Sequence, residues 1–188
     1  MYKLWQKKQN LKYSKDVLDI VQFGSSVMEG AKPNDIDIAV IFQKISLKDQ
    51  LNESQKIKKQ IQENIELPIH ISSFDLYSFF DKGNFAKEGI LFYGKSLIFH
   101  DEFSNRLGIK PKLNIFYSLR NLEKKDKIKF NYLLNGKGGK YGLLKKYGGR
   151  IISPGVIEIS PEHEFIFTES MKKITKNISV KNIFELKE

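Results

Sequence analysis

The sequence contains no cysteine among its 188 residues, which excludes disulfide bonds and metal sites built on thiolates. Histidine is also scarce. His70, His100 and His163 are far apart in the chain, so no zinc-binding motif is predicted.

Long apolar runs are missing as well. None approaches the roughly 18 residues that a membrane-spanning helix requires, and the opening MYKLWQKKQNLKYSKD lacks the apolar core of a signal peptide. We therefore expect a cytoplasmic protein that does not enter a membrane. Apolar residues make up 40% of the chain, which is enough for a hydrophobic core.

Acidic residues are depleted in one part of the chain. Residues 110–150 contain 12 lysines and arginines but only Glu123 and Asp126, whereas the remainder holds 20 basic and 20 acidic residues. The net charge of +10 therefore comes from this block. Concentrated positive charge attracts phosphate polymers through counterion release, so RNA or DNA is the predicted partner of the block. A solvated surface without a partner is the alternative.

The order of predicted elements indicates the α+β class and two domains, 1–105 and 110–188. The first is expected to contain both strands and helices. Its predicted strands lie at 20–23, 35–42 and 67–74, its predicted helices at 10–19 and 46–65, and one or two short helices with a turn at Gly94 follow. The helix at 46–65 should be capped by Ser46 and bury Leu47, Leu51, Ile57, Ile61 and Ile65.

The second domain is expected to be a small, basic α/β unit. Two helices are predicted between residues 113 and 136, and the second should bury a stripe of Ile128, Tyr132 and Leu133. A β-like stretch at 151–160, a helix at 161–176 and a final strand at 178–186 complete it. Aromatic and β-branched residues are too numerous here for a disordered arm.

Two carboxylates stand inside an apolar strand of the first domain. Because strand side chains alternate between faces, Asp35 and Asp37 point the same way, while Ile36 and Ile38 point into the core. Adjacent carboxylates repel each other and resist burial, so the pair requires either a strand end that is open to water or a neutralising cation. Mg²⁺, or Mn²⁺, suits the pair, since such an ion binds carboxylates and also accepts phosphate oxygens.

A Gly-Ser-Ser turn precedes this strand. Gly24 allows the backbone to approach a phosphate closely, and Ser25 can bond a phosphate oxygen. The following N–H groups, from Ser26 onward, can cradle it. Taken alone, the turn would be unremarkable; beside the carboxylate pair it predicts a nucleotide site.

The stretch FGSSVMEGAKPNDIDIAVIF resembles the signature of the DNA polymerase beta-like nucleotidyltransferases, particularly the minimal nucleotidyltransferases of prokaryotes. The resemblance covers about residues 10–100, and EGILFYGKSLIF resembles the segment that closes these domains. It implies a mixed sheet flanked by helices, with Mg²⁺ at Asp35 and Asp37 and a nucleoside triphosphate such as ATP at Gly24 and Ser25. The implied reaction transfers a nucleoside monophosphate to a hydroxyl or phosphate and releases pyrophosphate.

One position departs from the family pattern. The family usually carries a third carboxylate on the next strand, where this sequence has His70, with Ser72 on the same face. Asp75 comes later and would need a bulge to approach the site. His70 could act as a general base, or it could mark lost catalysis.

The basic block contains GKGGKYGLLKKYGGR, with six glycines in fifteen residues. The residues expected to contact nucleic acid are Lys137, Lys140, Lys145, Lys146 and Arg150, with Tyr141 and Tyr147 as stacking surfaces. The Gly-Lys-Ser/Thr ending of a P-loop is absent. Two glycine-capped turns around a short helix, with Gly148 as a cap, explain most of the glycines without a ligand.

Three functions fit the sequence. The first is a Mg²⁺-dependent nucleotidyltransferase, with RNA such as a tRNA end as the favoured acceptor and DNA or a protein hydroxyl as others. The second is a catalytically reduced module of this fold that binds nucleic acid. The third is an antitoxin-like partner of a helical ribonuclease toxin, a role against which the charge of +10 argues.

Overall fold

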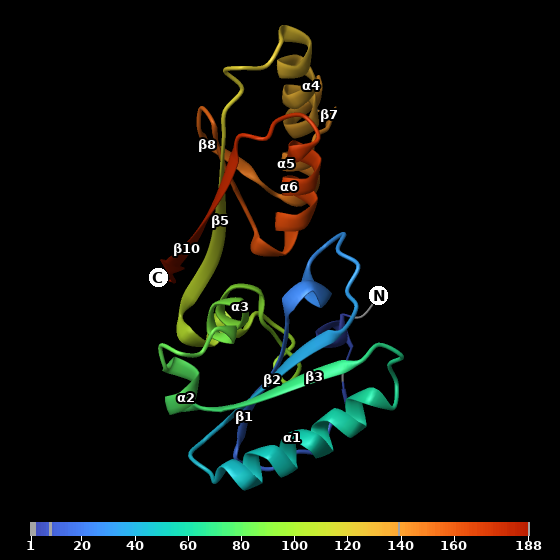
Figure 1. Cartoon of the computed structure of the whole chain (residues 1–188), viewed down its shortest axis with the longest axis vertical. Helices are drawn as coiled ribbons and strands as arrows, with labels where there is room; N and C mark the ends of the chain where they lie inside the picture. Colours follow the sequence, from blue (N-terminus) through green and yellow to red (C-terminus); the bar gives the residue numbers. More distant parts are fainter. Residues whose placement is uncertain (1–2, 8, 139, 188) are drawn as a thin grey trace. The chain divides into compact units, whose positions relative to one another are not determined.

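The computed structural model describes residues 3–7, 9–138 and 140–187, without the side chain of residue 140, and it confirms the α+β class (Figure 1). Contacts divide the chain into two units. Unit 1 comprises Met1–Val27 and Lys32–Gly108, and unit 2 comprises Met28–Ala31 and Ile109–Glu188. No helix among the described residues has both the length and the apolar character needed to cross a lipid bilayer.

Unit 1 is built on a four-stranded mixed sheet with the order β3-β2-β1-β4. Its strands are β1 (Val17–Phe23), β2 (Ile36–Phe42), β3 (Ile69–Asp75) and β4 (Lys95–Ser96). The apolar strand predicted at 35–42 is confirmed as β2, which lies inside the sheet between antiparallel β1 and parallel β3. The strand predicted at 67–74 is confirmed as β3.

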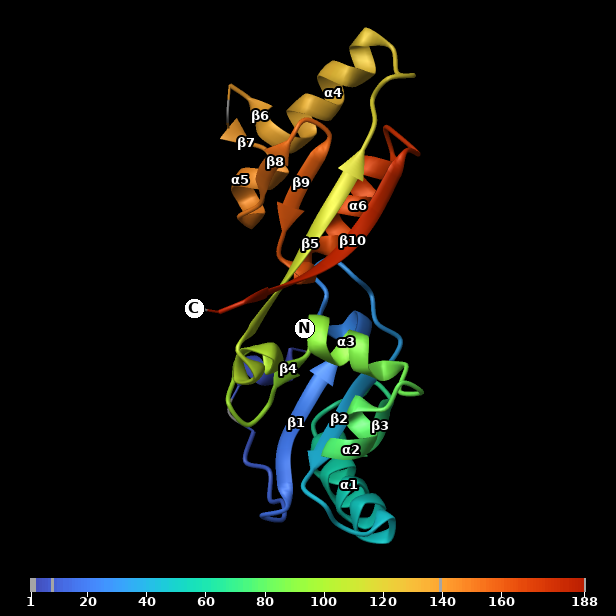
Figure 2. The same ribbon diagram turned by 90° about the vertical axis from the view of Figure 1, so that its left-hand side faces the viewer.

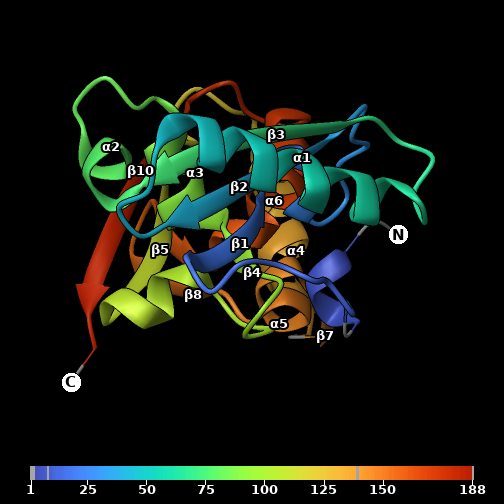
Figure 3. The same ribbon diagram turned by 90° about the horizontal axis from the view of Figure 1, so that it is seen from below.

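Different helices cover the two faces of this sheet. α1 (Leu47–Gln62) packs Ile57 and Ile61 against one face (Figure 3). α2 (Leu76–Phe80) and α3 (Ala86–Tyr93) contribute to the apolar cluster on the other face. Successive side chains of β2 alternate between the two clusters, so residues two apart in β2 share a face.

The helix predicted at 10–19 is wrong. Residues from Val17 onward form β1, which extends the strand predicted at 20–23. Val17, Ile20 and Val21 are at most 7% exposed, and they contribute to apolar clusters on both faces of the sheet. Pairing with β2 on one edge and β4 on the other favours the extended conformation.

The helix predicted at 46–65 is confirmed as α1, and its predicted buried row is confirmed at Ile57 and Ile61 but not at Leu47 and Leu51. Leu47 and Leu51 are 67% and 50% exposed. The buried residues of the helix are Gln50, Ser54, Ile57 and Ile61. A polar residue is tolerated in this row because Ser54 Oγ lies 2.8 Å from Ser73 Oγ, within hydrogen-bond distance.

Unit 2 has a second four-stranded sheet, in the order β10-β5-β9-β8, and every pair in it is antiparallel. Its strands are β5 (Ile109–Tyr117), β8 (Arg150–Ser153), β9 (Val156–Ile159) and β10 (Ile178–Leu186). β10 runs alongside β5 over its whole length (Figure 2). α4 (Lys124–Asn135), α5 (Leu143–Tyr147) and α6 (Glu164–Lys172) gather on one side of these strands (Figure 1), and a small hairpin of β6 (Gly136–Lys137) and β7 (Lys140–Tyr141) precedes α5.

The first of the two helices predicted between 113 and 136 is wrong, because that segment belongs to β5. Leu113 and Ile115 are fully buried, whereas Lys112, Asn114 and Phe116 are not, which is the alternation of a half-buried strand. The second helix is confirmed as α4. Its buried residues are Phe130 and Leu134 rather than the predicted stripe.

A short piece of the loop between β1 and β2 belongs to unit 2. Glu29 N donates to Glu162 O at 2.8 Å, in the 3-10 helix η4 (Pro161–His163). Gly30 has a φ of +79°, and a Cβ placed there would lie 2.8 Å from Ile166 Cγ1 of α6. Residues 28–31 therefore cluster with unit 2, although the chain enters and leaves them from unit 1.

One acidic side chain is buried in unit 1. Asp19 of β1 is 1% exposed, and its Oδ1 accepts hydrogen bonds from Ser96 Oγ at 2.7 Å and from Ile20 N at 2.8 Å. Its Oδ2 lies 3.9 Å from Arg106 Nη1 and has no hydrogen-bond partner among the described residues. Burial outweighs these interactions and raises the pKa of Asp19 from 3.8 to about 6.

The raised pKa of Asp19 predicts a pH dependence of stability. Protonated Asp19 is favoured in the folded protein, so its contribution is complete below pH 3.8 and is lost as the pH rises through about 6. Relative to Asp19→Asn, the free energy of unfolding of the wild type should fall by about 1 to 3 kcal/mol between pH 4 and pH 7. Urea unfolding of both proteins at several pH values measures this difference, and parallel curves would contradict it.

Candidate functional site

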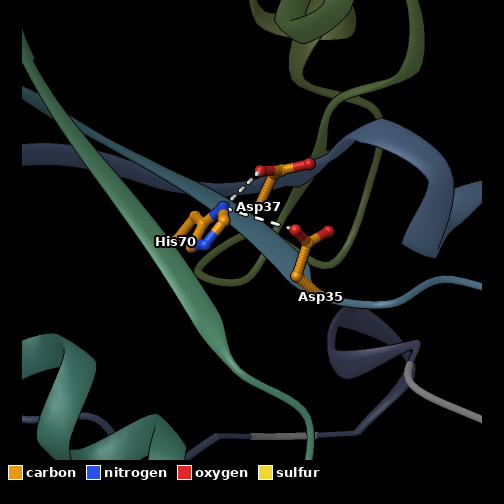
Figure 4. Close-up of side chains that lie close together, drawn as sticks. All are labelled: Asp35, Asp37 and His70. Atoms are coloured by element: carbon orange, nitrogen blue, oxygen red, sulfur yellow. Dashed lines mark ion pairs between the residues drawn. The ribbon is translucent and has the colours of Figure 1, made fainter.

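The register between β2 and β3 brings the two predicted aspartates to the predicted histidine. Asp37 lies directly beside His70 in this parallel pair. Asp35 immediately precedes β2 and, two residues before Asp37, points to the same side. The side chains of Asp35, Asp37 and His70 point toward one another (Figure 4).

The polar atoms of these residues face one another across a small gap. His70 Nδ1 lies 3.4 Å from Asp35 Oδ2 and 3.9 Å from Asp37 Oδ1 (Figure 4). One ligand atom from each of the three residues can be chosen so that all lie within 4.8 Å of one another. The Asp35 and Asp37 side chains are 33% and 32% exposed, and that of His70 is 65% exposed, so the group is open to solvent.

The charge of Asp37 is disfavoured where it stands. Its pKa is raised, first because burial penalises the ionised carboxylate, and then because Asp35 adds a second negative charge. His70 opposes this shift and lowers the pKa of Asp37. A cation placed between these groups would relieve both the burial penalty and the repulsion.

Gly24 stands against the carboxylate of Asp37. It follows Phe23, which pairs with Asp37 across the antiparallel β1–β2 ladder. Its φ of +72° favours glycine, and a Cβ placed there would come within 3.0 Å of Asp37 Oδ2. The absence of a side chain at Gly24 is therefore what lets the turn and the carboxylate share this space.

The two serines of the turn differ in their surroundings. Ser25 is exposed in the 3-10 helix η2 (Gly24–Val27), so its hydroxyl is accessible to a ligand. Ser26 was predicted to contact phosphate through its N–H group, and its side chain is 6% exposed. The Ser26 hydroxyl donates to Phe23 O and accepts from Gln22 Nε2. The Ser26 side chain therefore shapes the turn.

Asp75 does not reach the site. The β2–β3 register runs without a shift from Ile36 beside Ile69 to Phe42 beside Asp75, so no bulge moves Asp75 towards His70. Asp75 is instead the N-cap of α2, where it accepts a hydrogen bond from Ser78 N at 2.7 Å. This bond is the main reason that the pKa of Asp75 is lowered.

The residues of the basic block that were predicted to contact nucleic acid differ in whether their charge is paired. Lys137, Lys145 and Lys146 are exposed, whereas the side chain of Lys140 lies outside the described residues. Arg150 Nε donates to Glu158 Oε1 at 2.9 Å, so its charge is paired. The short helix α5 ends at Gly148 in the left-handed region with a φ of +72°, as the glycine-cap explanation predicts.

The two tyrosines of this block also differ. Tyr141 is 94% exposed and has a φ of +66°, in a region that non-glycine residues seldom adopt. Tyr147 packs against His163 and Phe167, with ring centroids 4.9 Å and 6.1 Å away. Tyr141 is therefore available for stacking on a base, whereas Tyr147 packs against other aromatic side chains of unit 2.

The donor set at the first site fits a divalent cation. Two carboxylates and an imidazole nitrogen are ordinary ligands of such ions, and exposure leaves room for water or phosphate oxygens as further ligands. Sequence reasoning identified these three residues, but it did not predict that Gly24 abuts Asp37. That contact depends on the β1–β2 register.

Comparisons of the chain with protein-family models and with curated proteins find no match.

Proposed function

We propose that this protein is a divalent-cation-dependent nucleotidyltransferase that transfers a nucleoside monophosphate from a nucleoside triphosphate to RNA. The observation that carries the proposal is the packing of the Gly24 turn against Asp37, beside Asp35 and His70. A phosphate-binding turn next to a cation site is the combination that a nucleoside triphosphate with its metal ion requires. The resemblance of residues 23–42 to nucleotidyltransferases supports the same reaction.

Each residue has a defined task in this proposal. Asp35 and Asp37 would hold the cation, which when bound neutralises the triphosphate and polarises its phosphorus–oxygen bonds. Gly24 allows the backbone to approach the phosphates, and the exposed Ser25 hydroxyl donates a hydrogen bond to one of their oxygens. The acceptor oxygen bonds to the α-phosphorus, the bond from this phosphorus to the bridging oxygen breaks, and pyrophosphate leaves. The acceptor proton passes to water.

A transfer assay tests the proposal. The whole protein is incubated with each α-labelled nucleoside triphosphate, with Mg²⁺ or Mn²⁺, and with tRNA, other RNA, DNA or protein as acceptor. Labelled RNA and released pyrophosphate are expected, and EDTA should abolish both. If no acceptor is labelled with either ion, the proposed reaction is wrong.

Unit 2 supplies the proposed acceptor contact. Exposed Lys137, Lys145 and Lys146 lie close in sequence to exposed Tyr141, which combines phosphate attraction with a surface for base stacking. We expect the triple substitution of these lysines by glutamate to weaken RNA binding at least about 100-fold at low salt and to flatten its salt dependence. Tyr141→Ala should cost about 1 to 3 kcal/mol of binding.

Fluorescence anisotropy with labelled RNA at several salt concentrations measures both effects. The matched control replaces Lys48, Lys56 and Lys59 of α1, which are also exposed, by glutamate. This control changes the net charge by the same amount. Equal losses in the two triple variants would show that only overall charge matters.

A second function is favoured by one observation. His70, rather than a carboxylate, lies beside Asp37 on the neighbouring strand. A module of this fold that binds nucleic acid without catalysis would bind RNA independently of Mg²⁺ and transfer nothing. The transfer assay and the anisotropy measurement together distinguish it from the enzyme.

A further inference from the structure

We infer that the Asp35–Asp37–His70 group selects a later first-row transition ion, such as Co²⁺ or Zn²⁺, over Mg²⁺. This inference deepens the proposed function by naming the class of its cation. It depends on cation binding at this site but not on nucleotidyl transfer.

The distances around His70 fit an ion better than a direct contact. An N–H···O hydrogen bond spans about 2.7 to 3.2 Å between its heavy atoms. The separations of Nδ1 from Asp35 Oδ2 and Asp37 Oδ1 are longer, at 3.4 Å and 3.9 Å. Ligand bonds of about 2.1 Å in a tetrahedral site place neighbouring ligand atoms about 3.4 Å apart. The gap between imidazole and carboxylates is therefore of the size that an ion fills.

The position of His70 makes its nitrogen a ligand of the same ion that the aspartates bind. His70 is held beside Asp37 by the uninterrupted β2–β3 register, so it does not depend on a loop for its position. Its Nδ1 is directed to both carboxylates (Figure 4). A base that activates an acceptor would instead need to face the acceptor rather than the cation.

The chemistry of imidazole determines the preference. Mg²⁺ is a hard ion that favours oxygen ligands in near-octahedral geometry. Imidazole nitrogen suits the later transition ions, whose affinity for nitrogen sites rises from Mn²⁺ towards Cu²⁺ and remains high for Zn²⁺. Replacing one oxygen ligand by nitrogen should therefore lower affinity for Mg²⁺ and raise it for Co²⁺ and Zn²⁺.

Calorimetric titration of the EDTA-treated whole protein with Mg²⁺, Mn²⁺, Co²⁺ and Zn²⁺, without nucleotide, tests the inference. Wild type should bind Co²⁺ and Zn²⁺ at least about 100-fold more tightly than Mg²⁺. His70→Asp should reduce this ratio at least about tenfold, because its third ligand becomes oxygen. The absorption spectrum of the Co²⁺ complex should also change in His70→Asp and stay unchanged in the control His100→Ala.

The possible results separate the inference from the proposed function. A ratio that is the same in wild type and His70→Asp, or no binding of any ion to wild type, would overturn the inference. The same holds if the Co²⁺ spectrum is insensitive to His70. If ions bind as expected while no acceptor is labelled, the inference holds and the nucleotidyltransferase proposal fails.

Discussion

Asp37→Asn is expected to lower the rate of nucleotidyl transfer at least about 1000-fold, because the cation loses a charged ligand whose stabilisation is worth several kcal/mol. The substitution should not lower the stability of the fold. Burial and Asp35 both raise the pKa of Asp37, so its charge opposes folding at neutral pH in the absence of a cation. The variant should therefore be at least as stable as wild type when EDTA is present. Single-turnover transfer and urea unfolding measure the two effects.

The control for this prediction is Asp49→Asn. Asp49 is exposed in the first turn of α1, where its carboxylate accepts from Ser46 Oγ at 2.6 Å. The substitution removes the same charge from the same unit, and asparagine can still accept that hydrogen bond. Transfer should be unchanged in Asp49→Asn. A similar loss of activity in both variants would mean that Asp37 has no special role.

Gly24→Ala is expected to reduce transfer about 100-fold, since the displacement of a reacting group by about 1 Å has effects of this size. Its Cβ would come within 3.0 Å of Asp37 Oδ2, so either the carboxylate or the turn must move. The φ of +72° adds backbone strain of about 1 kcal/mol. Both the free energy of unfolding and the affinity for the cation should fall.

The control variant Gly108→Ala separates the backbone strain of a positive φ from the steric clash with Asp37. Gly108 has a similar φ of +65°, but a Cβ placed there would have nothing within 4 Å. We expect this variant to lose a similar amount of stability to backbone strain, about 1 kcal/mol, and to keep full transfer activity. If Gly24→Ala behaves in the same way, the turn does not position Asp37.

The presence of a glycine turn and a carboxylate pair in one site could be predicted because both lie within the short stretch from Gly24 to Asp37, although their contact could not. Alternation along a strand is enough to place Asp35 and Asp37 on one side. The position of Asp75 could not be predicted in the same way. Only the continuous β2–β3 register and the capping bond to Ser78 show that Asp75 is held away from Asp37.

The errors in the predicted fold have a common physical origin. The segments around Val17 and Leu113 were predicted to be helical, but both become strands when a neighbouring strand pairs with them. Such pairing joins residues far apart in the chain, which local spacing does not report. Similarly, the buried row of α1 includes Ser54 because the Ser73 hydroxyl on β3 lies within hydrogen-bond distance of it.

The location of residues 28–31 affects how this protein can be divided. A gene cut after Gly108 would leave Glu29 with unit 1 and would remove the carbonyl of Glu162 that accepts its hydrogen bond. The strand carrying Asp37 is therefore connected to Gly24 through a segment that unit 2 holds in place. Exchange of the C-terminal unit between proteins of this architecture would have to preserve the close approach of Ile166 to Gly30.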